Sequence, residues 1–243
     1  MITVLVNGAN GRMGSEACKA INNDPSLELI GQIDYKDDLQ KSIETLKPQV
    51  VVDLTIASAG FGNAQTILNA GARPVIGTSG FLQEQVAKLQ SLAKEKSLGG
   101  LIAPNFSVGA VLMMKFAGIA AQYLPDVEVI EAHSPQKEES PSGTGLRTAE
   151  IINAARRSLP TPTSDKELIE GARGAELENV KLHSVRLPGV VAQQTVFFGG
   201  TGETLKIEHN SQSRESFMPG ICLACRKVVE REELVYGLEH LMD

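Results

Sequence analysis

The first hundred residues alternate between short, largely apolar runs and longer segments whose apolar positions have helical spacing. Short apolar runs bounded by glycine or polar residues are typical of buried parallel strands. These runs lie at residues 2–7, 27–33, 49–54, 73–76 and 100–103. Helical spacing is found at residues 12–22, 60–70 and 82–96. The alternation predicts an α/β fold with a Rossmann-like doubly wound parallel sheet, which holds ligands at the carboxyl ends of its strands.

The pattern changes in the second half of the chain. An apolar helix is expected at residues 108–123 and a strand at residues 127–130. Further strands bounded by turns are expected at residues 181–187, 193–198 and 204–209, with a hairpin at residues 199–202. This composition predicts an α+β domain with a mixed sheet. Apolar side chains that favour an oligomer interface on one face of that sheet are Val190, Val191, Val196 and Phe198.

Composition and charge exclude several classes of partner. A net charge of −6 and a pI near 5.4 argue against nucleic acid, because a polyanion needs a basic face. No apolar run approaches the length of a membrane span, and the chain enters a strand at once, so we expect neither a membrane segment nor a signal peptide. Three cysteines favour a reducing compartment and a cytoplasmic protein. Cys222 and Cys225 fall in a helical pattern and are predicted to be buried packing residues rather than a zinc or redox half-site.

A glycine-rich turn joins the first strand to the first helix. Glycine allows a sharp turn and lets a pyrophosphate approach the helix N-terminus. The residues expected to contact a dinucleotide here are Gly8, Ala9, Asn10, Gly11, Arg12 and Met13. Asp34 follows the second strand, twenty residues after Gly14, where a carboxylate suits the ribose hydroxyls. Arg12 or Lys36 could instead meet a 2′-phosphate, so the choice between NADH and NADPH stays open. The alternative is a glycine-rich turn without a ligand.

Two further loops follow strands of the same predicted sheet and are placed to line the nicotinamide end of the cofactor. Their residues are Gly77, Thr78 and Ser79 in one loop and Ala103, Pro104, Asn105 and Phe106 in the other. The alternative for each loop is a simple connection. With the glycine turn, these loops predict an NAD(P)-binding domain of residues 1–106, to which two C-terminal helices at residues 217–229 and 234–241 return. Residues 107–215 then form a domain for substrate binding and oligomerisation.

The stretch at residues 131–137, closed by residues 141–145, concentrates the candidate chemistry. The strand before it delivers His133 to its end, and Lys137 lies four residues later. Ser142, Gly143 and Thr144 then open a helix that runs to about residue 157. An imidazole, an ammonium group and a helix N-terminus suit an anionic substrate that must be protonated, and the amides suit a carboxylate. We therefore expect a small carboxylic acid that accepts hydride and is protonated by His133.

Other interpretations of these residues stay open. Lys137 could form a Schiff base. The whole stretch could also be an ordinary loop with a helix N-cap. The remaining histidines are His183, His209 and His240, which we expect to be surface or packing residues, although His209 and Arg214 flank the last strand and could reach the substrate. No residues have convincing metal-ligand spacing, so no metal is expected.

Together these motifs resemble the dihydrodipicolinate reductase family, the 4-hydroxy-tetrahydrodipicolinate reductases of the diaminopimelate route to lysine. The resemblance covers essentially the whole chain. Its matching segments, in the family's order, are residues 8–14, 77–81, 103–109, 131–133 with Lys137, and 141–144. The chain departs from the family's usual pattern at Ser134, where a second histidine is common, and at Glu139 and Ser140, where Asp-Ala is common.

The resemblance implies a homotetrameric enzyme that reduces a cyclic imine dicarboxylate with NADH or NADPH. It implies that His133 is the proton donor, that Lys137 is its acidic partner, and that Gly143 and Thr144 bind a substrate carboxylate. Ser134 retains a hydroxyl that can hydrogen-bond a carboxylate. Two rival hypotheses stand beside this one: another NAD(P)-dependent imine reductase or amino-acid dehydrogenase, and a dinucleotide sensor without catalysis.

Overall fold

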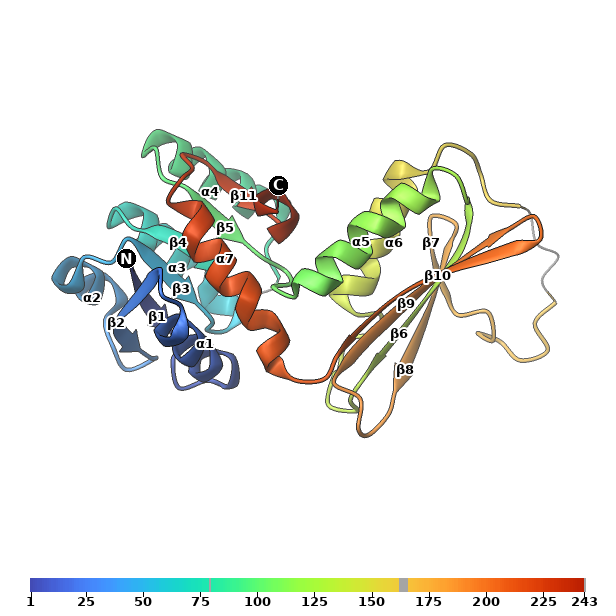
Figure 1. Cartoon of the computed structure of the whole chain (residues 1–243), viewed down its shortest axis with the longest axis horizontal. Helices are drawn as coiled ribbons and strands as arrows, with labels where there is room; N and C mark the ends of the chain where they lie inside the picture. The colour runs from blue at the N-terminus through green and yellow to red at the C-terminus, as the bar shows by residue number, and fades with distance from the viewer. Residues whose placement is uncertain (79, 162–165, 243) are drawn as a thin grey trace. The chain divides into compact units, whose positions relative to one another are not determined.

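The computed structural model describes residues 1–78, 80–161 and 166–242. The chain divides into two compact units. The first unit contains Met1–Val108 and Arg214–Asp243, and the second contains Gly109–Ser213. Each unit is built around one sheet (Figure 1).

The first unit contains a six-stranded parallel sheet in the order β11-β5-β4-β3-β1-β2. Its strands are β1 (Ile2–Asn7), β2 (Leu27–Ile33), β3 (Val50–Asp53), β4 (Arg73–Ile76), β5 (Gly100–Ile102) and β11 (Leu234–Tyr236). The central strands β1 and β3 are almost wholly apolar and buried, as expected for strands covered on both faces. The strand order reverses between β1 and β3, so ligands are expected at the carboxyl ends of these two strands.

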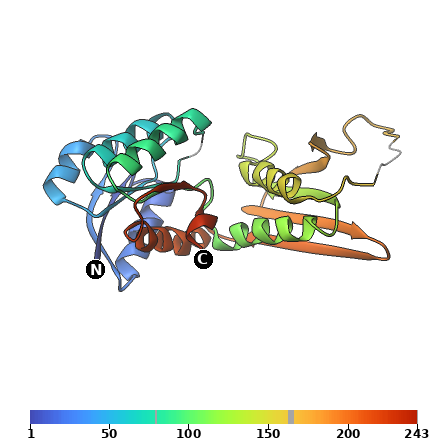
Figure 2. The ribbon, with the colours of Figure 1, turned by 90° about the horizontal axis from the view of Figure 1, so that it is seen from above.

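Helices cover both faces of this sheet (Figure 2). They are α1 (Arg12–Asn23), α2 (Leu39–Leu46), α3 (Ala57–Asn69), α4 (Gln83–Glu95) and α7 (Met218–Val228), the last preceded by the 3-10 helix η1 (Arg214–Phe217). Helix α7 packs beside α1, and α3 packs between α2 and α4 on the other face. Cys222 and Cys225 of α7 are buried and free, which confirms the prediction that they are packing residues.

Two parts of this unit differ from the sequence-based expectation. The prediction of a helix at residues 234–241 was wrong: Leu234–Tyr236 forms strand β11, which pairs with β5, and the 3-10 helix η2 (Leu238–Leu241) follows. Leu-Val-Tyr has strong strand preference, and Gly237 breaks the chain direction with φ of 104°. The pattern also missed α2, a helix of two turns that Asp38 caps by accepting a hydrogen bond from the Lys41 amide.

The second unit contains a five-stranded mixed sheet in the order β10-β9-β6-β8-β7. Its strands are β6 (Asp126–His133), β7 (Ala175–Leu177), β8 (Val180–Arg186), β9 (Ala192–Gly200) and β10 (Glu203–Ser211). Only the β6–β8 pair among them is parallel. Helices α5 (Val108–Ala121) and α6 (Gly143–Ala155) lie side by side, and Ile151 of α6 packs against Gly118 of α5. The two sheets confirm the predicted fold class.

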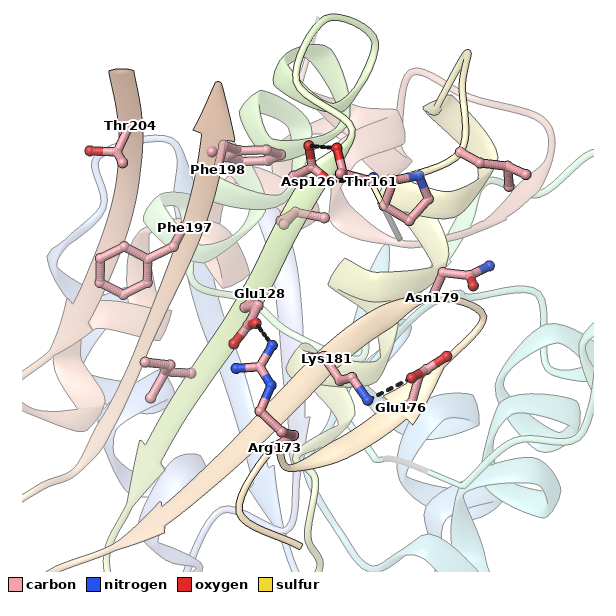
Figure 3. Close-up of a pocket in the computed structure, with 15 residues that line it drawn as sticks. Asp126, Glu128, Thr161, Arg173, Glu176, Asn179, Lys181, Phe197, Phe198 and Thr204 are labelled. Carbon is pink, nitrogen blue, oxygen red and sulfur yellow. Dashed lines mark hydrogen bonds and ion pairs between the residues drawn. The ribbon is translucent and has the colours of Figure 1, made fainter. Parts of the chain in front are cut away.

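One face of the mixed sheet packs beneath α6, and the other carries exposed apolar side chains. Val196 and Phe198 are buried on the helix side, so the prediction that they form an exposed interface was wrong. Because side chains alternate between the faces of a strand, Phe197 is the residue that points the other way. Phe197 lines a cavity of about 690 Å³. Figure 3 shows Phe197 with the ion-paired Glu128 and Arg173, which line the same cavity.

Candidate active site

The glycine turn after β1 is held by contacts that leave no room for side chains. A Cβ on Gly14 would stand 2.0 Å from the carbonyl oxygen of Gly8, and a Cβ on Gly8 would stand 2.9 Å from the Leu54 backbone. Gly8 has φ of +83°, a conformation that favours glycine. Gly11 is the N-cap of α1, and no described side chain caps that helix. The first amides of α1, from Arg12 and Met13 onward, have no partner within the helix, so the turn fits the diphosphate of a dinucleotide.

Asp34 joins this turn to the end of β2. Its Oδ2 accepts a hydrogen bond from the Asn10 amide at 2.9 Å, and its Oδ1 accepts one from the Tyr35 amide at 2.8 Å. These two bonds lower the pKa of the Asp34 carboxyl, which stays ionised. Lys36 lies over the exposed Tyr35 ring, 5.5 Å from its centroid. The carboxylate predicted to bind ribose is therefore fixed beside the glycine turn.

The two loops predicted to line the nicotinamide follow β4 and β5, which are neighbours in the sheet. A Cβ on Gly77 would stand 2.7 Å from the Phe106 ring, so the two loops are in close contact. Thr78 is buried, and its hydroxyl has no hydrogen-bond partner among the described residues. Ala103 and Phe106 are buried, and Asn105 accepts a hydrogen bond from the Ser107 amide. Pro104 is exposed, and Ser79 lies outside the described residues.

A buried carboxylate that the sequence analysis missed lies at the end of β3. Asp53 is fully buried and accepts hydrogen bonds from Asn7 Nδ2 at 2.8 Å, Asn63 Nδ2 at 3.1 Å and Thr55 Oγ1 at 3.0 Å. Burial raises its pKa to about 6 despite these bonds. The cluster joins the ends of β1 and β3 to α3, which braces the edge of the sheet where the glycine turn lies. A polar residue ending a buried strand was the signal available in the sequence.

We expect Asp53→Asn to gain stability relative to the wild type as the pH rises from about 4 to about 7. Folding raises the pKa of Asp53 from 3.8 to about 6. The wild type therefore loses stability as the pH rises from the lower to the higher of these values, because the carboxyl ionises more readily in the unfolded chain. The stability that the wild type loses over this interval is on the order of 3 kcal/mol, and an amide does not titrate. Asparagine can still accept from Asn7 and Asn63 through its Oδ1.

The measurement is the free energy of unfolding by urea at pH 4, 5.5 and 7. Glu44→Gln on exposed α2 removes the same charge and serves as the control. A constant stability difference between Asp53→Asn and the wild type across these pH values would contradict the assignment.

Strand β6 of the second unit positions the candidate proton donor. His133 is its last residue, and Glu131 lies on the same face two residues earlier. The carboxylate of Glu131 is fully buried, and its Oε2 lies 2.5 Å from His133 Nδ1. Its Oε1 accepts a hydrogen bond from the Ser142 amide at 3.3 Å. One carboxylate therefore holds both the imidazole and the residue that caps α6.

Arg186, which the sequence analysis did not single out, completes this group. It is the last residue of β8 and lies opposite His133 in the parallel pairing of β6 with β8. Its Nη1 and Nη2 each bind one oxygen of Glu131 at 3.0 Å, a bidentate pair. It also donates to the Glu139 carbonyl at 2.7 Å and to Ser140 Oγ at 2.8 Å. Burial would raise the pKa of Glu131, but bonds from His133 and Arg186 outweigh it and lower the pKa to about 2.

The N-terminus of α6 lies beside this group. Ser142 is buried, and its Oγ accepts a hydrogen bond from the Gly145 amide at 3.1 Å, so its hydroxyl acts as the N-cap. No described atom lies within 4 Å of where a Cβ on Gly143 would stand, which leaves the helix end approachable. Thr144 follows Gly143 in the first turn, and that turn contains no acidic residue.

Lys137 lies in the loop between β6 and α6. Its Nζ pairs with Glu139 Oε2 at 2.8 Å, and its amide donates to the Ser134 carbonyl. The structure thus places His133, Ser134, Lys137, Ser142, Gly143 and Thr144 in one region of the second unit. The predicted cofactor residues belong to the first unit. The binding and catalytic roles of all these residues remain predictions.

The other histidines lie outside this group of residues. His183 pairs with Glu128 at 2.8 Å, and the ring of His209 packs against the Gly109 backbone, where burial lowers its pKa. His240 lies in η2. Across the part of the chain that the structure describes, no group of three or more histidine, cysteine or acidic residues could hold a metal ion. Nor does that part contain a helix with the length and apolar character to cross a membrane.

Family models for dihydrodipicolinate reductase match both halves of the chain, the N-terminal model at residues 2–106 and the C-terminal model at residues 109–242. The 4-hydroxy-tetrahydrodipicolinate reductase of Legionella pneumophila (strain Lens) is 52% identical over 239 residues, which cover 98% of each chain. That of Listeria monocytogenes serovar 1/2a is 46% identical over 261 residues, with 99% of each covered. The dipicolinate-bound dihydrodipicolinate reductase of Paenisporosarcina sp. TG-14 superposes with a TM-score of 0.90 at 41% identity, with 99% of each chain covered. This chain belongs to the dihydrodipicolinate reductase family.

Proposed function

We propose that this protein reduces 4-hydroxy-tetrahydrodipicolinate to tetrahydrodipicolinate with NADH or NADPH, with release of the 4-hydroxyl group as water, in the diaminopimelate route to lysine. Family membership over both halves of the chain supports the reaction. The observation that carries the assignment of the site is the Glu131 carboxylate, which binds His133 on one oxygen and the Ser142 amide on the other. A proton donor and a carboxylate-binding helix end are therefore held by one buried group.

The first unit binds the cofactor in this proposal. The glycine turn and the N-terminus of α1 hold its diphosphate, and Asp34 holds a ribose. The loops at Gly77 and Phe106 enclose the nicotinamide. When bound, the reduced nicotinamide supplies the hydride for an electron-poor carbon of the substrate.

The second unit binds the substrate and supplies the proton. The amides at Gly143 and Thr144 bind one carboxylate, and Ser134 donates a hydrogen bond to the substrate. His133 protonates the anion that develops as hydride arrives, a step worth on the order of 10²–10⁴-fold in rate. Lys137 leaves Glu139 to stabilise that anion. The relative from Paenisporosarcina is described as dipicolinate-bound, which supports a planar dicarboxylate as the ligand class.

The test is the fall in nicotinamide absorbance when each cofactor is mixed with enzyme and with substrate generated in situ. We expect oxidation of NADH, NADPH or both, at a rate that depends on enzyme concentration. Cofactor binding without oxidation would favour a dinucleotide sensor. Oxidation with other cyclic imines but not with this one would favour a different imine reductase.

We expect Asp34→Ala to weaken NADH binding at least 10-fold and to weaken NADPH binding less. The carboxylate is ionised and fixed beside the glycine turn, where it can bind both ribose hydroxyls, whereas a 2′-phosphate would be repelled by it. The Kd of each cofactor is measured by fluorescence titration. Glu44→Ala removes one acidic charge from the same unit and is the control. Equal losses for both cofactors in Asp34→Ala would place Asp34 away from the ribose.

Assembly and location form part of the proposal. The face of the mixed sheet opposite α6 exposes Ile130 and Phe197, which are 37% and 39% accessible, and we propose that it is covered in a homotetramer. The three cysteines are all free and buried, which suits the cytoplasm. Light scattering of the purified protein would give its mass; a monomer would contradict the assembly.

A further inference from the structure

We propose that Glu131 and Arg186 are positioning residues that act through His133, fixing which ring nitrogen exchanges the proton and how readily it does so. The inference rests on the proposed function, in which His133 is the proton donor. In the proposed mechanism neither residue contacts the substrate.

The first step concerns the tautomer of His133. Glu131 is fully buried and ionised, so it accepts hydrogen bonds and cannot donate one. His133 Nδ1 lies 2.5 Å from its Oε2 and must therefore carry a hydrogen. Nε2 is then the nitrogen that gives up the proton and regains it. Without Glu131, either nitrogen could be protonated and the ring would lose its fixed orientation.

The second step concerns charge. A buried carboxylate alone beside an imidazole would stabilise the imidazolium and hold its proton too tightly. Arg186 binds both oxygens of Glu131 at 3.0 Å and offsets that charge. Lys137 and Glu139 of the following loop pair with each other at 2.8 Å. The Glu131–Arg186 pair thus orients His133 without leaving an uncompensated charge beside its ring.

The third step concerns the loop. Arg186 donates to the carbonyls of Lys137 and Glu139 and to the Ser140 hydroxyl, and Glu131 accepts from the Ser142 amide. The same pair therefore ties the loop that carries Lys137 to the strand that carries His133. A change at either residue is expected to move the proton donor and the helix end together.

The variants that test the inference are Glu131→Gln and Arg186→Met. Glu131→Gln removes the negative charge and leaves Arg186 unopposed, so we expect kcat at pH 7 to fall at least 10-fold and the basic limb of the kcat profile to move to lower pH. Arg186→Met leaves Glu131 unopposed, so the basic limb should move to higher pH. Arg186→Lys retains the charge and should keep the limb near its wild-type position. The Kd of NADH should stay unchanged in all three.

The control is Glu150→Gln on α6, where Glu150 forms an exposed pair with Arg147. It should leave kcat and its pH profile unchanged. A purely structural role would lower thermal stability without moving the pH limbs. The inference would be overturned if the basic limb moved in the same direction in Glu131→Gln and Arg186→Met, or if it moved in neither variant. Because Glu131 also holds the Ser142 amide, Glu131→Gln in a His133→Ala background should lower kcat by a smaller factor than it does in the wild type, and an equal or larger factor would also overturn the inference.

A measurement on the wild-type protein separates this inference from the proposed reaction. Nitrogen NMR of the four histidine rings, assigned with His133→Ala, should show a hydrogen on Nδ1 of His133 in the neutral form. A hydrogen on Nε2 alone would overturn the positioning role, whether or not the enzyme turns over. An Nδ1–H tautomer in a protein that oxidises neither cofactor would instead retain the positioning role and remove the proposed reaction.

Discussion

His133→Ala is expected to lower kcat by about 10²–10⁴-fold while leaving the Kd of NADH or NADPH nearly unchanged. His133 ends β6 in the second unit, whereas the residues predicted to bind the cofactor lie in the first unit. Removing the imidazole takes away the proton source but no group assigned to cofactor binding. The measurements are steady-state kinetics with substrate generated in situ and a fluorescence titration of each cofactor.

The control for this variant is His240→Ala, which removes a histidine from η2 that has no assigned role. It should keep the wild-type kcat. Thermal unfolding shows whether His133→Ala remains folded, because loss of the imidazole leaves Glu131 with one hydrogen bond fewer in a buried site. A large loss of cofactor affinity, with kcat little changed, would make His133 a structural residue and would contradict the proposed mechanism.

The parallel sheet was predictable because its signals are local. Buried parallel strands are apolar on both faces, so β1, β3 and β4 could be recognised from short, mostly apolar runs. Gly8 and Gly77 directly follow β1 and β4. The glycine turn and the N-cap Ser142 were found for the same reason, because both use neighbours within a few residues.

Elements whose conformation depends on partners far away in the sequence were harder to predict. Leu234–Tyr236 is a strand because β5, which lies 134 residues earlier in the chain, offers a free edge. Val196 and Phe198 are apolar whichever face they occupy, so composition alone could not show that Phe197 is the exposed member of the run.

The same distinction divides the candidate site. His133 and Lys137 could be predicted because a strand end and a helix start lie within twelve residues of each other. Arg186 could not, because its role follows from the parallel pairing of β6 with β8, 53 residues apart at His133 and Arg186. The same holds for Asp53, whose burial depends on Asn7 and Asn63 from other elements. The surroundings of both Arg186 and Asp53 are therefore set by residues from other elements of the fold.

Gly14→Ala is expected to weaken cofactor binding at least 10-fold and to destabilise the first unit by about 1–3 kcal/mol. The added Cβ would stand 2.0 Å from the Gly8 carbonyl oxygen and 2.8 Å from Ala9 Cα, both backbone atoms. Because the clash is with backbone atoms, the turn must change its conformation to make room for the methyl group. The amides at the start of α1 would then shift away from the diphosphate. Cofactor titration and urea unfolding measure the two effects.

Gly62→Ala provides the matched control in α3 of the same unit. No described atom lies within 4 Å of where its Cβ would stand, and Gly62 is exposed in the middle of the helix. Alanine there should stabilise the protein by roughly 0.5–1 kcal/mol and leave cofactor affinity unchanged. The two substitutions add the same methyl group, so opposite effects on stability would isolate the contact with Gly8. A wild-type cofactor affinity in Gly14→Ala would mean that the turn does not hold the diphosphate.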